Sequence, residues 1–370
     1  MTRVAAWLLG CWLLVACTGS NGVLPPSGGR LYEVLLVGDH EGLVRQMLTA
    51  DVEGLPQSEP SFDVSAVDSA RFGASLRLSR NIVMVNIAPT VYTKPHVGYE
   101  KNVWAKPQMV IRVGAPSLSQ LRRNAPAIAS ALRTLLNRAE INKTLAMMRH
   151  KRNTKAEQAI RQRFGIDLWI PVDMVASKQG DNFVWLSNNA TAAMQNIVVY
   201  RVPTLSPTVS AVNAEVARFV AQRNEVLGQA IKGETDSMWM TTVEPTVDKR
   251  LVFKNADDRS LWLNQKSLQH APMTIYRGLW EMHGDDMGGP FVSRVLLPID
   301  SARATKADGK AVVVEGFVFA PGQKKRNAMH RLEAVLYTLR WSEPKESKPI
   351  KGTQPGKETI NKNINIKNNP

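Results

Sequence analysis

Three stretches of the chain share one pattern of hydrophobic and polar positions. Each starts with a β-prone apolar run that reaches a proline: MVIRVGAPS (109–117), IVVYRVPT (197–204) and VVVEGFVFAPG (312–322). Apolar residues then recur in steps of three and four, which places them on one face of a helix. The three stripes are Ile128, Leu132, Leu135 and Ala139; Val212, Val216, Phe219 and Val220; and Met329, Leu332, Val335, Leu336 and Leu339. The pattern predicts an α+β fold of repeated units, in which mostly antiparallel strands are each followed by an amphipathic helix.

The first half of the chain contains two further predicted strands and one long predicted helix. RLYEVLLVGDH (30–40) predicts a buried strand that leads into a helix, and NIVMVNIAP (81–89) predicts another strand. A long helix is expected from Pro126 to about Arg163, with a break near Arg152–Asn153.

The second half of the chain is dominated by predicted strands. GIDLWIPVDMVAS (165–177) and NFVWLSNN (182–189) predict a strand pair joined by the turn KQGD. The runs at 272–283, 291–299 and 311–320 predict an antiparallel meander.

The N-terminus has the pattern of an exported lipoprotein. Arg3 precedes an apolar run at 4–16, which is too short to cross a bilayer as a helix and fits a secretory signal peptide. Leu14-Val15-Ala16-Cys17 resembles the bacterial lipobox, in which the cysteine becomes the first mature residue and carries lipid. The alternative is an ordinary signal peptide with a chance cysteine. From the lipobox we expect acyl chains such as palmitate on Cys17. Each buried methylene adds roughly 0.8 kcal/mol of membrane affinity, so several chains would anchor the protein without a transmembrane helix.

These signals define the predicted organisation. The last 29 residues are rich in Lys, Asn, Pro and Gly and are expected to be disordered. A change from helix to strand at Gly165 divides the remainder into two subdomains. The predicted segments are a signal peptide (1–16), a lipidated tether (17–29), an N-terminal α/β subdomain (30–164), a C-terminal α+β subdomain (165–341) and a tail (342–370).

Cysteine content and charge narrow the possible partners. Cys11 leaves with the signal peptide and Cys17 carries lipid, so the mature chain has no free thiol for a disulfide, a thiolate metal site or a nucleophile. The net charge of +15 favours anionic lipid, lipopolysaccharide or acidic glycan. An exported protein rarely meets nucleic acid, so no nucleic-acid partner is expected. No acidic run follows Cys17, which favours an outer-membrane lipoprotein that faces the periplasm.

Several longer motifs resemble a known family. They are YEVLLVGDHE, GLPQSEPSFDV, RNIVMVNI, KPQMVIRVGAP, NRAEINK, GIDLWIPVDM, RGLWEMHGDDMGGPFVS and KKRNAMHRLEAVLYTL. Together they are similar to the domain-of-unknown-function family 4837 of Gram-negative lipoproteins, over nearly the whole mature chain before the tail. The resemblance implies an envelope lipoprotein. It implies no activity, cofactor or functional residue.

The patch EMHGDDMGGPFVSR (281–294) is the first candidate site. Glu281 and His283 are two apart on a predicted strand and therefore point to one face, and Asp285 lies in the turn that follows. This group has the residue types for acid/base chemistry or an N/O metal site, but the spacing matches no established ligand motif. The interpretation that the neighbouring strands favour is a hairpin in which Asp285 and Asp286 lie in the turn. Positive φ angles are then expected at its glycines, Gly284, Gly288 and Gly289.

GDHE (38–41) is the second candidate, because ligands gather at the carboxyl ends of strands in open α/β sheets. Asp39 and Glu41 are its carboxylates. Position 44 is Val where a zinc-protease helix would need a second His, so that motif is absent. The more common role for Asp39 is a helix cap.

The third candidate is the basic helix between Arg133 and Arg163, which carries nine Lys or Arg residues against Glu140 and Glu157. Such a helix can bind an anionic surface or simply present a solvated face. The anion-binding candidates are Arg149, Lys151, Arg152 and Lys155.

Two weaker patterns complete the candidates. Three Asp-Ser-apolar triplets, which begin at Asp68, Asp236 and Asp300, resemble O-glycosylation acceptors. Tryptophans that could stack on sugars, or fill the core, are Trp104, Trp169, Trp185 and Trp280.

The sequence therefore favours a non-enzymatic, lipid-anchored envelope protein whose basic surface binds an anionic or protein partner. It contains no G-x-S-x-G, Walker A, G-x-G-x-x-G or H-E-x-x-H motif, and we expect no metal and no cofactor. The alternative is a hydrolase of envelope polymers that uses the carboxylate/His clusters described above.

Overall fold

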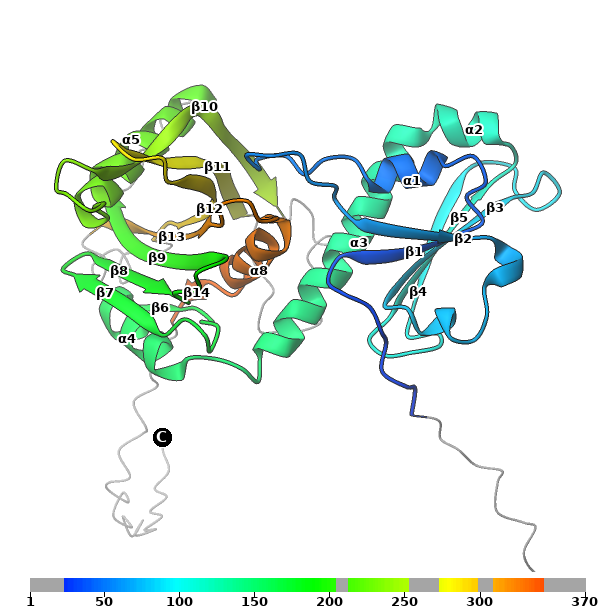
Figure 1. The fold of residues 1–370 in the computed structure, drawn as a ribbon, viewed down its shortest axis with the longest axis horizontal. Coiled ribbons are helices and arrows are strands. Elements are labelled where there is room, and N and C mark those ends of the chain that lie inside the picture. The colour runs from blue at the N-terminus through cyan, green and yellow to red at the C-terminus, as the bar shows by residue number, and fades with distance from the viewer. Residues whose placement is uncertain (1–22, 204–211, 253–272, 299–308, 343–370) are drawn as a thin grey trace, which may run out of the picture.

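The computed structural model describes residues 23–203, 212–252, 273–298 and 309–342, which form two lobes joined by one long helix (Figure 1). We call residues 23–148 the first lobe and the described residues from 149 to 342 the second lobe. Cys17, the predicted tail after Ser342 and the triplet at Asp300 lie outside the described residues.

The first lobe contains a five-stranded sheet in the order β2-β1-β3-β5-β4. Only β4 is antiparallel to its neighbour. The strands are β1 (Glu33–Val37), β2 (Asp63–Val67), β3 (Asn81–Ile87), β4 (His96–Lys101) and β5 (Met109–Ala115). The helices are α1 (Leu43–Leu48), α2 (Leu118–Arg123) and α3 (Ala125–Met148), with short 3-10 turns at Ser69–Arg71 and Leu76–Leu78.

Both faces of this sheet are covered. On one face, Leu36 and Ile111 pack in one core with Val44 of α1 and Leu136 of α3. On the other face, a smaller core that includes Val110 lies under the connection between β2 and β3. Alternate residues of the strands are therefore buried on opposite sides, as expected for parallel strands with cover on both faces.

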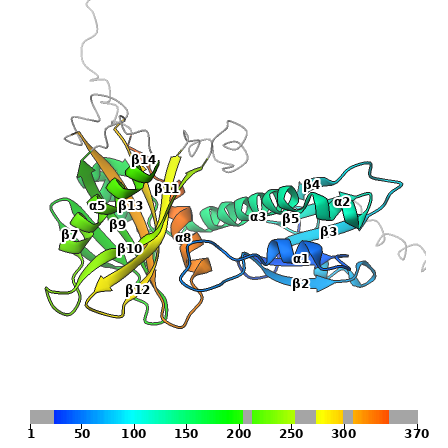
Figure 2. The ribbon, with the colours of Figure 1, turned by 90° about the horizontal axis from the view of Figure 1, so that it is seen from above.

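The second lobe contains a curled seven-stranded sheet in the order β10-β11-β12-β13-β9-β8-β7, with every pairing antiparallel (Figures 1 and 2). Its strands are β7 (Ala176–Gly180), β8 (Phe183–Ser187), β9 (Met194–Pro203), β10 (Trp239–Val252), β11 (Met273–His283), β12 (Gly288–Leu296) and β13 (Lys310–Phe319). A separate pair joins β6 (Ile166–Asp167) to β14 (Arg340–Trp341). The helices are α4 (Thr154–Phe164), α5 (Val212–Ala230) and α8 (Arg326–Tyr337).

The curled sheet is packed on both faces because its strands alternate. In β13, Val313 and Phe317 share a core with Phe219 of α5. Val314 and Val318 share the other core with residues of α4 and α8. The helix α8 therefore has the sheet on one side, and its other side is turned toward the first lobe (Figure 2).

The first lobe caps the N-terminus of α8 directly. The buried carboxylate of Glu59 accepts hydrogen bonds from the backbone N–H groups of Lys325, at 2.7 Å, and Arg326, at 3.0 Å. The guanidinium of Arg326 donates to the Pro60 carbonyl at 2.6 Å and to Asp63 at 2.7 Å. These contacts satisfy helix N–H groups that have no partner within α8, and they join the two lobes through buried polar groups.

Most predicted elements are confirmed, as is the α+β class. The expected helix break separates α3, which ends at Met148, from α4, which begins at Thr154. The expected meander is β11–β12–β13.

Two predictions need correction. The strand pair at 165–177 and 182–189 is formed only by β7 and β8, because Leu168, Ile170 and Met174 leave the sheet and fill the core. Positive φ is found at Gly284 but not at Gly288 or Gly289, which lie in β12. These two glycines permit close approach instead, since a Cβ on Gly289 would lie 2.0 Å from the Val318 carbonyl oxygen.

Candidate functional site

The GDHE cluster forms a helix cap in the first lobe. The Asp39 carboxylate accepts hydrogen bonds from the backbone N–H groups of Val44, at 3.2 Å, and Arg45, at 2.8 Å. Glu41 is exposed in the same connection between β1 and α1. Asp39 therefore stabilises the start of α1, although Gly42 occupies the N-cap position itself.

The EMHGDDMGGP cluster lies in the other lobe, at the hairpin between β11 and β12. Glu281, His283 and Asp285 are exposed, and the His283 ring stacks on Trp239 with centroids 4.0 Å apart. The described residues hold no group of three or more His, Cys, Asp or Glu side chains arranged to bind a metal. This cluster and GDHE belong to different sheets, and neither lines the cleft described below.

The anion-binding candidates lie around the turn between α3 and α4. Arg149, Lys151 and Lys155 are exposed. Arg152 is held by an ion pair with Glu157 at 3.4 Å and by the face of Trp169, whose centroid is 5.1 Å from the guanidinium. None of the four residues lines either of the two cavities described below.

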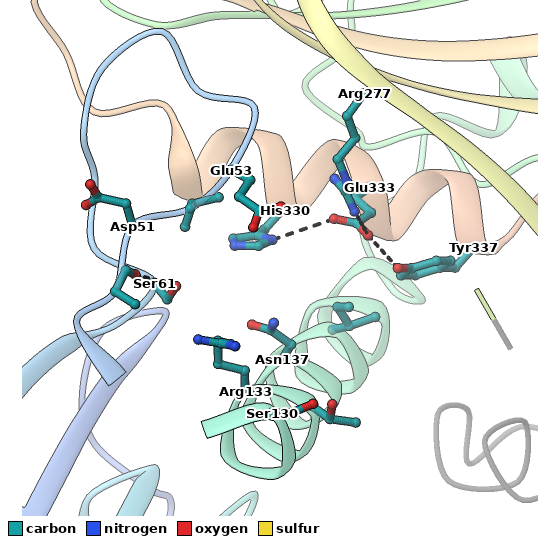
Figure 3. A pocket seen from close by; sticks show the side chains of 14 residues that line it. Asp51, Glu53, Ser61, Ser130, Arg133, Asn137, Arg277, His330, Glu333 and Tyr337 are labelled. Atoms are coloured by element: carbon teal, nitrogen blue, oxygen red, sulfur yellow. Dashed lines mark hydrogen bonds and ion pairs between the residues drawn. The ribbon is translucent and has the colours of Figure 1, made fainter. Parts of the chain in front are cut away.

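A cleft of about 460 Å³ lies between the lobes (Figure 3). Arg133, the first residue of the predicted basic helix, lines it, and none of the other predicted site residues does. This volume falls within the range of small-molecule sites, about 300–1,000 Å³. We call it the interlobe cleft. Its walls are α3 on one side and α8 with Arg277 of β11 on the other, and the loop at 50–53 closes one end.

The wall formed by α8 contains a buried, fixed carboxylate. Glu333, whose side chain is 6% exposed, pairs with Arg277 at 2.5 Å and accepts a hydrogen bond from the Tyr337 hydroxyl. Burial alone would raise the pKa of Glu333, but the charge of Arg277, with that of His330, holds it well below its usual range. Glu333 is therefore ionised, and its charge is held by Arg277 beside it.

Glu333 in turn orients His330. The Nδ1 atom of His330 lies 3.7 Å from a Glu333 carboxylate oxygen, one helical turn away. The other constraint is Tyr32 of the first lobe, whose ring stacks on the imidazole with centroids 4.2 Å apart. The imidazole is thus fixed by one group from each lobe, and it forms part of the cleft wall (Figure 3).

The wall formed by α3 presents hydrogen-bond donors. Arg133 and Asn137, one helical turn apart, point from α3 into the cleft toward α8 (Figure 3), and Ser130 and Thr134 complete the polar stripe. Arg133 is half-buried, and the hydrogen bonds and ion pairs of the described residues include none that engages its guanidinium. The N–H donors of the Arg133 guanidinium therefore face the cavity without a partner among the described residues.

The end of the cleft is acidic. Asp51 and Glu53 lie on the loop that closes it, and Asp51 accepts a hydrogen bond from Ser58 at 2.8 Å. Ser61 also lines this end, where its hydroxyl donates to the Ala50 carbonyl at 2.7 Å. The cleft thus has cationic donors along its sides and carboxylates at one end, which suits a polar molecule with both kinds of group.

Comparison with known families divides the chain close to the interlobe cleft. Residues 153–338, just over half of the chain, match the profile of a domain of unknown function, DUF4837. The chain belongs to this family. Residues 27–149 match a second domain of unknown function, DUF8532, so the DUF4837 match is shorter than the near-complete resemblance expected from the motifs. No curated protein matches the chain.

The cleft draws its walls from both matched regions. The DUF4837 region supplies Arg277, His330, Glu333 and Tyr337, and the DUF8532 region supplies the polar stripe of α3 and the closing loop. The site exists only where the two regions meet.

Proposed function

We propose that this DUF4837 protein is a lipid-anchored envelope protein that binds a small polar carboxylate in the interlobe cleft. The observation that carries the proposal is the guanidinium of Arg133, which is unpaired within the described part of the chain and faces His330 across a cavity of small-molecule size. A guanidinium binds a carboxylate with two parallel hydrogen bonds, and the Asn137 amide lies beside it as a further donor.

The groups around the ligand site are fixed before any ligand arrives. His330 is held by Glu333 and Tyr32, and Glu333 is held by Arg277 and Tyr337. Such preorganisation lowers the entropy cost of binding. The carboxylates Asp51 and Glu53 at the closed end favour an ammonium or hydroxyl group on the far side of the ligand.

Binding is favoured over the hydrolase alternative by the placement of the predicted clusters. Asp39 caps a helix, and Glu281 and His283 lie on an exposed strand end in the other lobe. A catalytic pair of carboxylates would need to meet around one substrate, and these residues do not line one cavity.

The proposed anchor is the lipidated Cys17, with the protein facing the periplasm from the outer membrane. The lipobox-like Leu14–Cys17 and the polar stretch after it support this assignment. None of the described helices is long and apolar enough to cross a membrane.

The binding proposal is tested by thermal unfolding of the purified full chain with succinate, citrate, glutamate, inorganic phosphate and glycerol 3-phosphate. A ligand at 100 times its Kd stabilises a folded protein by about 2.7 kcal/mol, which raises the melting temperature by several degrees. We expect at least one carboxylate to do so, and Arg133→Gln to remove the shift.

The matched control is Arg122→Gln, which removes an exposed arginine on α2 outside the cleft. It should respond to the ligand like the parent chain. A shift that survives Arg133→Gln, or no shift with any carboxylate, would refute the proposal. A shift in melting temperature seen only with inorganic phosphate or glycerol 3-phosphate would mean that the cleft binds phosphates and not carboxylates.

A further inference from the structure

A second cavity lies on the opposite face of α3. Ala139, Asn142 and Ala146 line it, whereas Arg133, Asn137 and Ile141 line the interlobe cleft; at 3.6 residues per turn these two sets point in opposite directions. This cavity has a volume of about 580 Å³ and lies between α3, the connection from β4 to β5, and the N-terminal segment at Ser27. We call it the basic groove.

The charged residues that line the basic groove are all cationic. They are Arg80, Lys101, Lys106, Arg138 and Lys143. The nearest buried carboxylate is Glu140, which lies behind the groove and pairs with Arg80 and Lys143, each at 3.1 Å. Arg80 and Lys143 share this single carboxylate, so Glu140 cannot neutralise both of them.

The buried part of this network is held together by hydrogen bonds. Asn81 donates to Glu140 at 2.9 Å and accepts a hydrogen bond from the Lys143 ammonium at 2.8 Å. Burial, only partly opposed by Glu140, lowers the pKa of Lys143 to about 8. Lys143 therefore remains mainly protonated at neutral pH, and an anion in the groove would stabilise its charge further.

Two lysines at the rim are available to a ligand. Lys101 and Lys106 are exposed, and no hydrogen bond or ion pair within the described part of the chain engages their ammonium groups. They flank the connection between β4 and β5 and face the same cavity.

The groove also has an apolar wall. Met109, Ala139, Ala146 and Met147 line it, and Met147 remains 53% exposed. A site that combines lysines with an exposed methionine suits an amphiphile with a phosphate group better than it suits a free inorganic ion.

The N-terminal segment brings this groove close to the proposed anchor. Lys106 donates its backbone N–H to the Pro25 carbonyl at 2.8 Å, and the Ser27 hydroxyl donates to the Pro107 carbonyl at 2.6 Å. Pro25 is eight residues after Cys17, so a fully extended chain spans at most about 29 Å between them. The segment leaves the molecule at the lower edge of Figure 1, where the C-terminal end of α3 also lies.

We infer that the basic groove binds the phosphate headgroup of an anionic phospholipid in the membrane that carries the anchor. Lys101 and Lys106 contact the phosphate, Arg80 and Lys143 supply fixed positive charge behind it, and Met147 contacts the first methylenes of the acyl chains. The proximity to the bilayer rests on the proposed Cys17 anchor; the chemistry of the groove does not.

The test is lipid binding by the full chain, solubilised in dodecyl maltoside and titrated with phosphatidylglycerol or phosphatidylcholine. Native mass spectrometry measures the fraction of protein that retains lipid. We expect phosphatidylglycerol to be retained in preference, and Lys101→Gln/Lys106→Gln to weaken its binding by roughly 25-fold, since one lysine near an anionic headgroup contributes about fivefold.

Two control pairs remove the same charge elsewhere. Arg149→Gln/Lys151→Gln acts just after the C-terminus of the same helix, and Lys94→Gln/Arg123→Gln acts on exposed positions that do not line the groove. Both should retain phosphatidylglycerol within about twofold of the parent chain. An equal loss in either control pair, or no preference for phosphatidylglycerol, would overturn the inference. These lipid-binding results do not depend on the other two proposals. The interlobe cleft is tested separately by thermal unfolding with carboxylates, and the Cys17 anchor by membrane fractionation.

Discussion

The ring of Tyr32 lies against the imidazole of His330, with centroids 4.2 Å apart and planes inclined by 15°. This stacked pair joins the DUF8532 region to the DUF4837 region beside the interlobe cleft. Tyr32 is 1% exposed, and its hydroxyl has no hydrogen-bond partner among the described residues. The ring, rather than the hydroxyl, is therefore the part of Tyr32 that orients His330.

Two substitutions of Tyr32 distinguish the contribution of its ring from that of its hydroxyl. Tyr32→Phe should leave the free energy of unfolding unchanged or raise it by about 1 kcal/mol, because it removes an unsatisfied buried hydroxyl and keeps the ring. Tyr32→Ala should lower it by about 3–5 kcal/mol, because it leaves a cavity beside His330. Urea unfolding of both variants provides the measurement. A large loss in Tyr32→Phe would mean that the hydroxyl has a stabilising partner.

Because Glu59 belongs to the first lobe and caps α8, the stability of α8 should depend on contact with that lobe. Glu59→Ala removes two hydrogen bonds to the backbone N–H groups of Lys325 and Arg326, so we expect a loss of about 2 kcal/mol in the free energy of unfolding. Glu100→Ala is the control, because its ion pair with Arg112 is exposed and should contribute well under about 1 kcal/mol. Equal urea midpoints for the two variants would argue against the cap.

The depressed pKa of Glu333 predicts a pH dependence. Because the folded pKa lies below the unfolded value of about 4.3, Glu333 stabilises the fold above that pH and loses this contribution as the pH falls toward the folded pKa. Glu333→Gln should lose about 3 kcal/mol at pH 7, since Arg277 is left without its partner. From pH 6 to pH 3, the free energy of unfolding of Glu333→Gln should fall by about 1–2 kcal/mol less than that of the parent chain.

Urea unfolding of both chains across this pH range provides the comparison. Parallel pH profiles would show that Glu333 titrates normally in the folded protein. Glu100→Gln, at an exposed position, should follow the parent profile throughout.

Periodicity predicted the elements well and the cleft poorly, for a physical reason. The apolar stripe of α8 was predicted by Leu332 and Leu336, which are buried against the sheet. His330 and Glu333 lie next to that stripe, and a helix pattern assigns such polar positions to solvent. In the structure α3 covers that side, and a contact between helices so far apart in the sequence leaves no periodic signal. The polar spacing Ser130, Arg133, Thr134, Asn137 was visible, but it is equally typical of a solvated helix face.

The parallel pairing in the first lobe illustrates the same limit. The runs that form β1 and β3 were recognised from their apolar residues, which fix burial but not the neighbour of each strand. The hairpin at Gly284, by contrast, was predictable because the turn is local and needs positive φ.

The close approach at Gly289 predicts a steric limit between β12 and β13. Gly289→Ala would place a Cβ 2.0 Å from the Val318 carbonyl oxygen, so the sheet must shift, and we expect a loss of about 3 kcal/mol or more. Gly180→Ala is the matched control in a strand, because its Cβ would meet nothing closer than Phe183 at 3.9 Å. The free energy of unfolding of Gly180→Ala should lie within about 1 kcal/mol of the value for the parent chain. If Gly289→Ala were equally mild, β12 and β13 would have to be less closely packed than described.

The two cysteines provide a matched test of the anchor. Cys17→Ser removes the proposed lipid attachment, so the protein should move from the membrane fraction to the soluble fraction of envelope preparations. Cys11→Ser changes the same residue type within the predicted signal peptide and should leave the protein membrane-bound. Several acyl chains supply far more membrane affinity than a basic surface alone, because each buried methylene contributes roughly 0.8 kcal/mol. We therefore expect release of Cys17→Ser to be nearly complete in 0.5 M salt, which screens any remaining attraction of the basic groove to lipid. Membrane retention of Cys17→Ser at that salt concentration would refute the anchor. Release of Cys11→Ser would mean that Cys11, and not Cys17, carries the lipid.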